Sequence, residues 1–449
     1  MNKAPVPERN TLSMQSLPGF RDFLPDDCAR RNYLFARWRE VARRYGFVEW
    51  EGPPLEATEL YKKKSGAEIV EQLFNFTDKG EREVALRPEL TPTLARVVAA
   101  HEREFKKPLK WFSIGQFFRY EKQQRGRLRE FYQLNADIIG EQVSPSNGDA
   151  ESIALSIDLL RSFGFTASDF LVRVGSRDVW IQTFLKERFG GVIPDLQTQT
   201  DFFNVLDKLE GEPEAKVTDR LKAFKTSLVE VREFIATAKL NLLSGTADFS
   251  DKDISLRRFD MLYRDLRARG LAEFVDIDLT VVRGLAYYNG TVFEVYSRGT
   301  GERAIAGGGR YDYLLPNLFD VNLTAVGFAM GDVVLGNFVD ETPHARAIRD
   351  EWIAREGKLD IYMVIAKEER RADALAQIQQ LRDRGYRVDY PLTPTKVARQ
   401  FQSAEDLGAR VALLYGDEWP QVAMKNLASG EQKLISSDDL LSGVEFIVR

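Results

Sequence analysis

Two runs in which apolar and aromatic residues alternate with charged residues, one on each side of a polar loop, occupy the segment from 110 to 140. This alternation predicts two antiparallel strands, and the loop from 121 to 130 makes them a single long hairpin. The loop carries four basic side chains: Lys122, Arg125, Arg127 and Arg129. The hairpin therefore predicts an antiparallel sheet in this part of the chain.

Helical patterns precede and follow the hairpin. Near the start, five apolar residues at helical spacing predict a helix capped by 25–27 and ending before Gly46: Leu34, Trp38, Val41, Ala42 and Tyr45. From about 176 to 250 the spacing is helical, with many Lys and Glu residues and few strand formers. Strand-like runs then return at 276–282, 291–297 and 325–330.

This order predicts one sheet-containing catalytic domain in two halves, with a helical insertion between them. The predicted bounds are 1–174 and 256–345 for the two halves and 175–255 for the insertion. A final segment, 357–449, alternates apolar strands with polar helices and predicts a small domain of mostly parallel βαβ units. The fold class is therefore α/β, with an α+β catalytic domain and a separate C-terminal domain.

Composition excludes several classes of function. The net charge of -5 gives no overall field that would attract nucleic acid, so any such contact must come from local basic patches. With no apolar signal segment and no run of about 20 apolar residues, we expect a cytoplasmic protein without a membrane partner. One cysteine, Cys28, and two histidines, His101 and His344, are too few for a disulfide or a structural zinc site. Any metal should be oxygen-bound Mg²⁺.

The hairpin is the best candidate for chemistry. Its first strand ends in FRYE at 118–121, and its return strand begins with REFYQL at 129–134. An arginine on a rigid strand can hold a phosphate through two hydrogen bonds, and a neighbouring aromatic ring can stack on a base. These residues therefore suit a nucleotide. The alternative is a solvated hairpin with a charged tip.

These two segments resemble motif 2 of class II aminoacyl-tRNA synthetases, and further segments resemble the histidyl-tRNA synthetase family across nearly the whole chain. Residues 18–25 (PGFRDFLP) resemble the opening of that family. Residues 46–56, with Pro53, resemble motif 1, which implies a homodimer. The most specific match is VRGLAYYNGTVFE at 282–294, followed by AGGGRYD at 306–312.

The resemblance implies a histidine pocket. LRPELT at 86–91 resembles the segment that holds the substrate's α-amino group, which assigns Glu89 and Thr91 to that role. The rest of the pocket is assigned to Gln133, Asp137, Tyr287, Tyr288 and Tyr311. Polar groups that read the imidazole nitrogens would reject other amino acids, because a wrong side chain leaves them unpaired. The alternative for the tyrosines is simple packing in the sheet.

The resemblance also implies sites for ATP and for tRNA(His). Arg119 and Arg283 are the expected catalytic residues at the α-phosphate, while Glu121, Phe131 and Arg127 are expected at the adenine amino group, the adenine ring and the terminal phosphates. Mg²⁺ should bridge the phosphates, with protein ligands unassigned. The expected tRNA contacts are Lys122, Gln124 and Arg125 in the hairpin loop and Lys396, Arg399, Gln400 and Phe401 in the last domain, which resembles an anticodon-binding domain. For that last group the alternative is an ordinary helix.

The chain departs from the family at a few positions. Motif 3 of most members ends in an arginine that clamps the γ-phosphate, but this chain has GFAMGDVV at 327–334, with Val334 in its place. Arg310 is a possible replacement. Ala286 stands where aspartate is common, and Asp137 where many bacterial members have glutamate.

The resemblance implies a histidine–tRNA ligase, which forms histidyl-adenylate and then charges tRNA. Two alternatives remain open. The first is a histidine-binding regulatory paralogue without catalytic activity, which the missing arginine favours. The second is a related class IIa synthetase for proline, threonine or glycine, against which the peptide at 283–288 argues.

Overall fold

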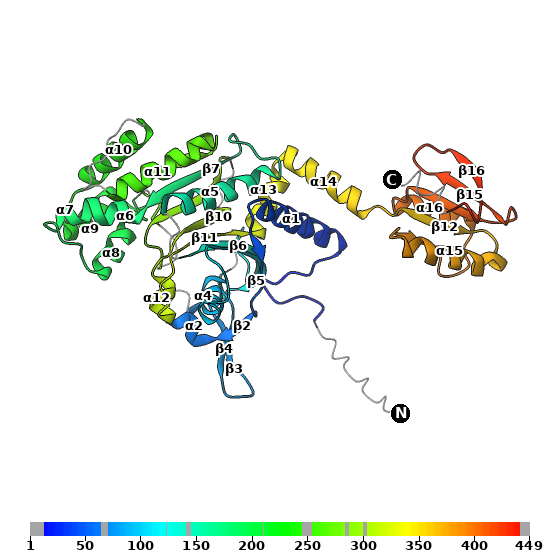
Figure 1. Cartoon of the computed structure of the whole chain (residues 1–449), viewed down its shortest axis with the longest axis horizontal. Helices are drawn as coiled ribbons and strands as arrows, with labels where there is room; N and C mark the ends of the chain where they lie inside the picture. The colour runs from blue at the N-terminus through cyan, green and yellow to red at the C-terminus, as the bar shows by residue number, and fades with distance from the viewer. Residues whose placement is uncertain are drawn as a thin grey trace, which may run out of the picture. The chain divides into compact units, whose positions relative to one another are not determined.

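In a computed structural model the chain forms two compact units, Met1–Arg349 and Asp350–Arg449 (Figure 1). The structure describes residues 13–63, 71–122, 124–140, 145–209, 211–244, 254–282, 287–299 and 303–440. Each unit has its own sheet. The α/β class predicted from the sequence is confirmed.

An eight-stranded sheet forms the centre of the first unit, with the strand order β1-β5-β6-β11-β10-β9-β7-β8. In that order the strands are Val48–Glu49, Leu109–Phe118, Glu130–Ile139, Ala325–Gly331, Ala306–Arg310, Thr291–Ser297, Phe170–Ser176 and Val275–Ile277. Neighbouring strands are antiparallel except in the outer pairs β1–β5 and β7–β8. The predicted hairpin is confirmed as β5 and β6, which pair from Leu109↔Ile139 to Phe118↔Glu130.

One face of this sheet is covered by helices that bury its apolar side chains. Helix α5 (Pro145–Arg161) packs against β6, β10 and β11, with α1 (Pro25–Arg44) and α11 (Ile254–Ala268) beside it (Figure 1). The predicted face of α1 is buried at Leu34, Trp38, Val41 and Ala42. The helix begins at a proline, which suits the first helical position, and no side chain caps it, contrary to the predicted cap.

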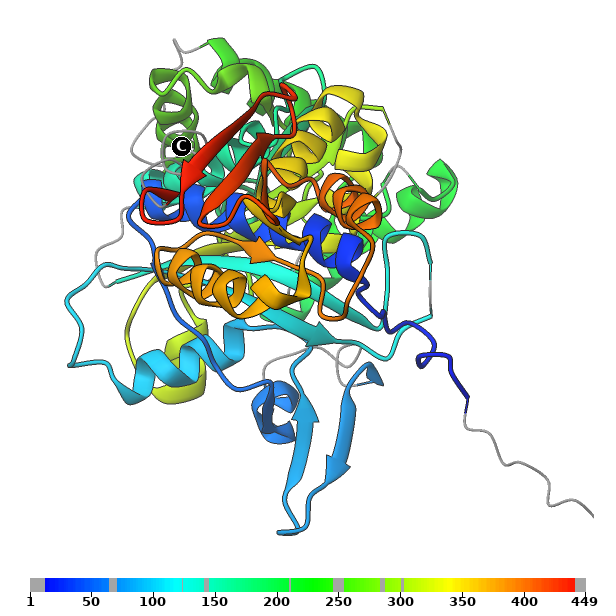
Figure 2. The same ribbon diagram turned by 90° about the vertical axis from the view of Figure 1, so that its right-hand side faces the viewer.

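A smaller sheet, β2-β4-β3, extends away from the main one and forms the blue strands at the bottom of Figure 2. Its strands are Leu55–Ala57 (β2), Phe74–Thr77 (β3) and Glu83–Leu86 (β4). Helix α2 (Thr58–Lys62) packs against β2 and β4 and contacts α4 (Thr91–Ala100). Helix α12 (Leu314–Phe319) packs on α4. The end of β4 leads directly into the segment with Glu89 and Thr91.

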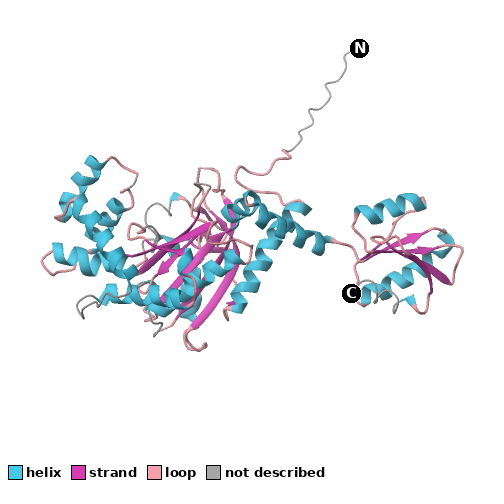
Figure 3. Ribbon diagram, turned by 90° about the horizontal axis from the view of Figure 1, so that it is seen from above, coloured by secondary structure: helices cyan, strands magenta, loops and turns pink. Residues whose placement is uncertain are grey.

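The predicted helical stretch contains short helices, drawn in cyan in Figure 3. They are α6 (Arg177–Val179), the π-helix η1 (Trp180–Leu185), α7 (Lys186–Arg188), α8 (Leu196–Leu206), α9 (Glu214–Leu221), the 3₁₀-helix η2 (Lys222–Phe224) and α10 (Leu228–Ser244). Trp180, Phe184 and Phe202 pack there at ring distances of 5.2–5.9 Å. After α11, the 3₁₀-helix η3 (Ala272–Phe274) leads into β8. Helix α13 (Asp332–Glu341) follows β11, and α14 (Pro343–Gly357) leads into the second unit.

The second unit has a five-stranded sheet in the order β13-β12-β14-β15-β16. The predicted parallel strands are confirmed as β12 (Ile361–Ile365), β13 (Val388–Asp389) and β14 (Val411–Tyr415), connected through η4 (Glu368–Arg370), α15 (Arg371–Asp383) and α16 (Val397–Asp406). Two antiparallel strands that were not expected complete the sheet, β15 (Gln421–Asn426) and β16 (Gln432–Ser436). Among the described helices of the chain, none is long and apolar enough to cross a membrane.

Candidate active site

One face of strand β6 presents a row of functional side chains. Alternate residues of a strand point to the same side, so Phe131, Gln133, Asn135 and Asp137 all face away from α5. The residues between them, such as Leu134 and Ala136, are buried in the core. The alternation noted in the sequence thus separates the site from the core within one strand.

Small residues of the next strands form the floor of the site. Asn135 pairs with Ala329 of β11, which pairs with Gly307 of β10, which pairs with Glu294 of β9. Because Gly307 and Ala329 have little or no side chain, the middle of this row is low and its ends are raised. A cavity of about 670 Å³ lies over it.

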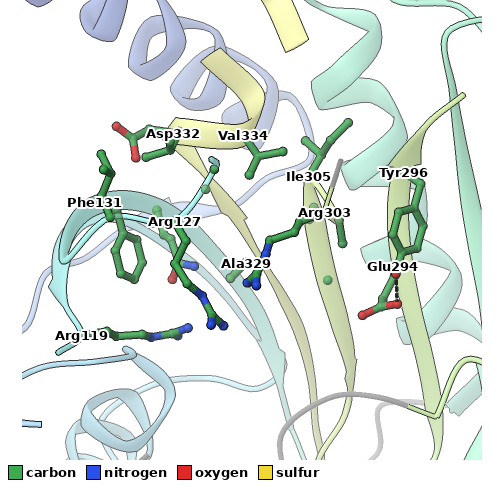
Figure 4. A pocket seen from close by; sticks show the side chains of 18 of the residues that line it. Arg119, Arg127, Phe131, Glu294, Tyr296, Arg303, Ile305, Ala329, Asp332 and Val334 are labelled. Atoms are coloured by element: carbon green, nitrogen blue, oxygen red, sulfur yellow. Dashed lines mark hydrogen bonds between the residues drawn. The ribbon is translucent and has the colours of Figure 1, made fainter. Parts of the chain in front are cut away.

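Figure 4 shows the walls of this larger cavity, with Arg119 and Phe131 on one side and Glu294 and Tyr296 on the other. Arg119 donates a hydrogen bond of 3.0 Å from Nε to the carbonyl oxygen of Pro88, and its guanidinium lies 5.2 Å from the centre of the Phe131 ring. Phe117 stacks on Phe131 at 5.9 Å. These contacts fix an arginine and a flat aromatic surface side by side.

The hairpin loop closes part of the same cavity. Arg127 forms an ion pair with the buried carboxylate of Glu121. A Cβ atom on Gly126 would lie 3.2 Å from Cγ2 of Val334, so the loop lies against the first turn of α13. Gln124 accepts a hydrogen bond of 3.1 Å from Arg303, on the connection that leads into β10.

Two carboxylates of the cavity wall have protein partners. The Tyr296 hydroxyl donates to Glu294 at 2.5 Å. Asp332 accepts hydrogen bonds from Arg21 Nη1 at 2.8 Å and from the backbone N–H of Tyr132 at 2.9 Å. Burial raises the pKa of Asp332, while the charge of Arg21 acts in the opposite direction. Arg21 thereby ties the segment at 18–25 to the start of α13.

Few side chains around this cavity could coordinate a metal ion without help from a substrate. Within the described ranges, no group of three or more His, Cys, Asp or Glu side chains is arranged to hold one. Mg²⁺ commonly binds through one or two carboxylates together with substrate phosphates and water. Glu294, which points into the cavity in Figure 4, fits such a donor set.

A second, smaller pocket of about 50 Å³ adjoins the first and is strongly polar. The Tyr311 hydroxyl donates to Asp137 Oδ1 at 2.5 Å, and the Tyr287 hydroxyl donates to Glu89 Oε2 at 3.0 Å. Thr91, Gln133, Asn135 and Tyr288 complete the polar lining. Glycine is required at position 327 in its lining, because a Cβ atom on Gly327 would lie only 2.0 Å from Asp137 Oδ1.

The three tyrosines of this pocket remain protonated hydrogen-bond donors at neutral pH. Burial is the main cause that raises the pKa of each of Tyr287, Tyr288 and Tyr311, and the nearby carboxylates Glu89 and Asp137 raise it further. Arg119, Gln133 and Ala329 line both the small pocket and the larger cavity. The two spaces therefore meet at a fixed guanidinium group.

Arg177 contacts the backbone of Tyr288, a residue that lines the small pocket. Its guanidinium donates to the carbonyl oxygen of Val282 at 3.0 and 2.7 Å and to that of Tyr288 at 2.8 Å. Burial lowers its pKa to about 10, so it remains charged at neutral pH. These bonds connect the backbone of Val282 to that of Tyr288 through one side chain. Arg283 and Ala286 themselves lie outside the described residues.

Comparison with known proteins identifies the family. The sequence model of histidyl-tRNA synthetase matches residues 19–332, and that of an anticodon binding domain matches residues 360–446. This chain belongs to the histidyl-tRNA synthetase family. A histidine–tRNA ligase of Opitutus terrae is 42% identical over 90% of this chain and 91% of the relative. The alternative of a synthetase for proline, threonine or glycine is therefore set aside.

Solved structures show the same fold. The histidyl-tRNA synthetase of a Nostoc species matches with a TM-score of 0.72 at 24% identity, over 97% of this chain and 100% of that one. A Bacillus halodurans protein described as an ATP phosphoribosyltransferase regulatory subunit/histidyl-tRNA synthetase matches with a TM-score of 0.67 at 24% identity, over 88% of this chain and 97% of that one. The fold alone therefore does not separate the two functions.

Arg310 does not replace the motif 3 arginine in the larger cavity, and the expectation that it could is wrong. Its guanidinium is buried and donates to Asp149 at 3.0 and 2.6 Å and to Asp312 at 3.0 Å. It lies on a separate small pocket, away from the larger cavity. The neighbouring glycines have different roles: Gly307 faces the cavity, but Gly308 and Gly309 are required by close strand packing.

The residues expected to contact tRNA differ in their exposure. Lys122, Gln124 and Arg125 are exposed in the hairpin loop, as are Lys396 and Arg399 in the second unit. Phe401 is half-buried, with Lys425 Nζ 5.3 Å from its ring centre.

Gln400 is wrong as a tRNA contact, because its side chain is 0% exposed. Its amide accepts from Ile365 N–H at 2.8 Å and donates to the carbonyl oxygens of Ile365 at 2.9 Å and Thr395 at 2.6 Å. It joins α16 to β12 and supports the fold of the second unit.

Sequence reasoning did not single out several residues that line or support the site: Arg21, Asn135, Arg177, Glu294, Tyr296, Arg303 and Asp332. Period-two alternation could have identified Asn135 and Tyr296, which lie two residues from Gln133 and Glu294. Arg177 and Arg303 carry no local signal, because their partners are distant in the sequence.

Proposed function

We propose that this protein is a histidine–tRNA ligase, which activates L-histidine with ATP and transfers it to the 3′ end of tRNA(His). The observation that carries this proposal is the junction of the two cavities. Arg119 and Gln133 line both the small pocket of tyrosines and carboxylates and the larger cavity. An amino acid in the first and a nucleotide in the second would meet at the Arg119 guanidinium.

Histidine suits the small pocket. Glu89, oriented by Tyr287, supplies a negative charge for the α-ammonium group, and Thr91 supplies a hydroxyl oxygen beside it. Four polar side chains surround the space for the imidazole ring: Gln133, Asp137, Tyr288 and Tyr311. A ligand without ring nitrogens would leave these buried groups unpaired, which can give roughly 10⁴-fold rejection.

The first step joins the two substrates. A carboxylate oxygen of histidine attacks the α-phosphorus of ATP, and the bond from that phosphorus to the bridging oxygen breaks, so pyrophosphate leaves with the electron pair. Negative charge grows on the α-phosphate oxygens and is stabilised by fixed cations. Arg119 holds one such position, and the family resemblance assigns a second to Arg283.

ATP suits the larger cavity. The Phe131 ring offers a stacking surface for adenine, Glu121 lies near it to accept from the adenine amino group, and Arg127 is directed to the terminal phosphates. Mg²⁺, when bound, neutralises phosphate charge and makes pyrophosphate a better leaving group. Glu294 is the carboxylate placed to hold it, and Tyr296 orients that carboxylate.

In the second step a ribose hydroxyl of the terminal adenosine attacks the acyl carbon of the adenylate. Neither His101 nor His344 lines the cavity, so a phosphate oxygen of the adenylate is our candidate for the proton acceptor. Lys122, Gln124 and Arg125 would contact the acceptor end through phosphates and bases.

The domain organisation follows the same proposal. We infer a catalytic domain from 1–174 and 256–345, a helical insertion at 175–255, and an anticodon-binding domain at 357–449. The family model for residues 360–446 supports the last assignment. Lys396, Arg399 and Phe401 are the candidates there for tRNA contacts.

We also infer a homodimer in the cytoplasm. The segment that resembles motif 1 contains β1, which is the edge strand of the main sheet. Val48 in this strand is 61% exposed, and Leu55 nearby is 38% exposed. Apolar side chains at an open sheet edge suit a partner chain. Light scattering of the purified protein tests this point.

A regulatory paralogue that binds histidine without charging tRNA is the second candidate. Val334, in place of the motif 3 arginine, favours it, because it removes a cation from the cavity. The retained arginines Arg119 and Arg127 and the match to the anticodon-binding domain favour the ligase.

Histidine-dependent exchange of labelled pyrophosphate into ATP, followed by charging of tRNA(His), separates the two functions. We expect both activities in the wild type, their loss in Arg119→Ala, and their retention in Arg82→Ala. The control removes an exposed arginine of the β3–β4 turn that pairs only locally, with Asp78. Tight histidine binding without exchange would instead establish the regulatory function.

A further inference from the structure

The larger cavity has a third arginine, Arg303, for which neither the family resemblance nor the proposed function gives a role. It lies three residues before β10, and its neighbours Ala304 and Ile305 also line the cavity. In Figure 4 its side chain extends from the wall opposite Arg127, and the two guanidinium groups project toward one another.

Arg127 pairs with Glu121 on its own side of the cavity, and Arg303 adds a second cation on the other side, so an anion placed between them would attract both. Arg127 comes from the hairpin loop and Arg303 from the connection between β9 and β10, so they approach from opposite sides. An anion bound by both needs several oxygen atoms spread over a few ångströms. The chain of phosphates in a nucleoside triphosphate has this form.

One hydrogen bond of Arg303 goes to an uncharged acceptor. Its Nη2 donates to the neutral amide oxygen of Gln124 at 3.1 Å. A phosphate oxygen carries a negative charge that the amide oxygen of Gln124 lacks, so it attracts the guanidinium more strongly. Phosphate would therefore compete well with the glutamine amide.

The other arginines near the site are placed differently. Arg119 is fixed by Pro88 and lies over Phe131, at the end of the cavity shared with the small pocket. Arg310 is buried against Asp149. Val334 supplies no charge and lies against Gly126. Among the described residues that line the cavity, Arg303 is thus the arginine opposite Arg127.

We propose that Arg303 binds the terminal phosphates of ATP together with Arg127, and so supplies the cation that Val334 does not. This inference rests on the proposed function, because it identifies a substrate contact of that same site. Gln124 holds the guanidinium at the cavity wall until the nucleotide arrives. The family's usual cation on α13 is thereby replaced by one from the opposite side of the cavity.

The test measures ATP dependence in pyrophosphate exchange and the binding of ATP and AMP by calorimetry. Arg303→Ala should raise the KM for ATP about 10- to 100-fold, because it removes charge-assisted hydrogen bonds. The KM for histidine and the affinity for AMP, which lacks the terminal phosphates, should change less than about twofold, since charged contacts to the missing groups are not made. Arg303→Lys should recover part of the loss.

Arg298→Ala is the matched control. This arginine lies at the other end of the same connection, where its Nε donates to the carbonyl oxygen of Ala167 at 2.8 Å, and it does not line the cavity. The double variant Arg303→Ala, Val334→Arg adds a second test. An arginine on α13 should restore ATP affinity if the two positions serve the same phosphates.

Two results would overturn the inference: an ATP affinity within twofold of the wild type in Arg303→Ala, or an equal loss of ATP and AMP binding, which indicates a structural role. If the wild type shows no exchange, the proposed function fails, but the calorimetric comparison of ATP with AMP still decides the role of Arg303.

Discussion

The hydrogen bond between Tyr311 and Asp137 allows a direct test of the proposal that the small pocket binds histidine. Tyr311 is 2% exposed, and its hydroxyl donates to Asp137 Oδ1 at 2.5 Å. The change Tyr311→Phe removes one oxygen atom and leaves the ring in place. Asp137, which is 4% exposed, then loses a donor that water cannot easily replace.

Hydrogen bonds to charged groups contribute about 1.5–3 kcal/mol. If Asp137 positions the imidazole ring, this loss should lower kcat/KM for histidine roughly 10- to 150-fold, since about 1.4 kcal/mol corresponds to a factor of ten. The KM for ATP should change little. Because burial raises the pKa of Tyr311, the wild-type hydroxyl is protonated at neutral pH.

Tyr296→Phe is the control for this prediction. It removes a hydroxyl with the same 2.5 Å distance to a carboxylate, but its partner Glu294 lies on the wall of the larger cavity, where we propose that ATP binds. We expect that variant to affect the KM for ATP and to spare histidine. A Tyr311→Phe protein with an unchanged kcat/KM for histidine would refute the assignment of Asp137 to the ring.

The remaining predictions concern packing, support and pH. Gly327→Ala should lower stability by about 1–3 kcal/mol and weaken histidine binding at least tenfold, because the new Cβ would lie 2.0 Å from Asp137 Oδ1. Calorimetry with histidine measures the binding, and an affinity equal to that of the wild type would contradict the prediction. Arg177→Lys should lower pyrophosphate-exchange activity about tenfold and leave tRNA binding unchanged, because an ammonium group cannot donate to both carbonyl oxygens as the planar guanidinium does. Full exchange activity would show that these bonds are not needed. Gln400→Leu should lower the free energy of unfolding in urea by about 2 kcal/mol, because the N–H and carbonyl of Ile365 lose their partner. Weaker tRNA binding at unchanged stability would instead show that Gln400 contacts tRNA. Stability should fall above about pH 10, since the three buried tyrosines of the small pocket have pKa values raised above that of the unfolded chain; thermal unfolding at constant salt tests the direction.

Strands that alternate clearly were predictable from the sequence. The predicted strand at 291–297 has the same first and last residues as β9, and the predicted hairpin at 110–140 closely matches β5 and β6. Both were recognisable because a sheet with one buried face imposes an alternation of period two on its strands. Strand β10 was not predicted. Its glycines are poor strand formers, and only the register with β9 and β11 explains them, since a side chain at Gly308 would strike Phe328.

The candidate site was predictable to the extent that its parts are contiguous in the sequence. The family resemblance identified Glu89, Asp137 and Tyr311 as candidates, and all three line the same small pocket. Arg310 was misjudged, because a sequence does not show on which side of a strand a buried ion pair forms. Gln400 was misjudged for a related reason: an amide on a helix has the same sequence signature whether it faces tRNA or a backbone.

The bond between Arg21 and Asp332 has a consequence for the order in which the protein forms. The two residues are separated by 311 positions, so Arg21 leaves the ribosome long before its partner is made. At roughly 5–20 residues per second, that interval lasts on the order of half a minute. During this time the segment at 18–25 cannot yet make its final contacts with α13, and the larger cavity lacks Asp332 in its wall. A nascent chain released before residue 332 would contain most of the sheet and still lack a complete site.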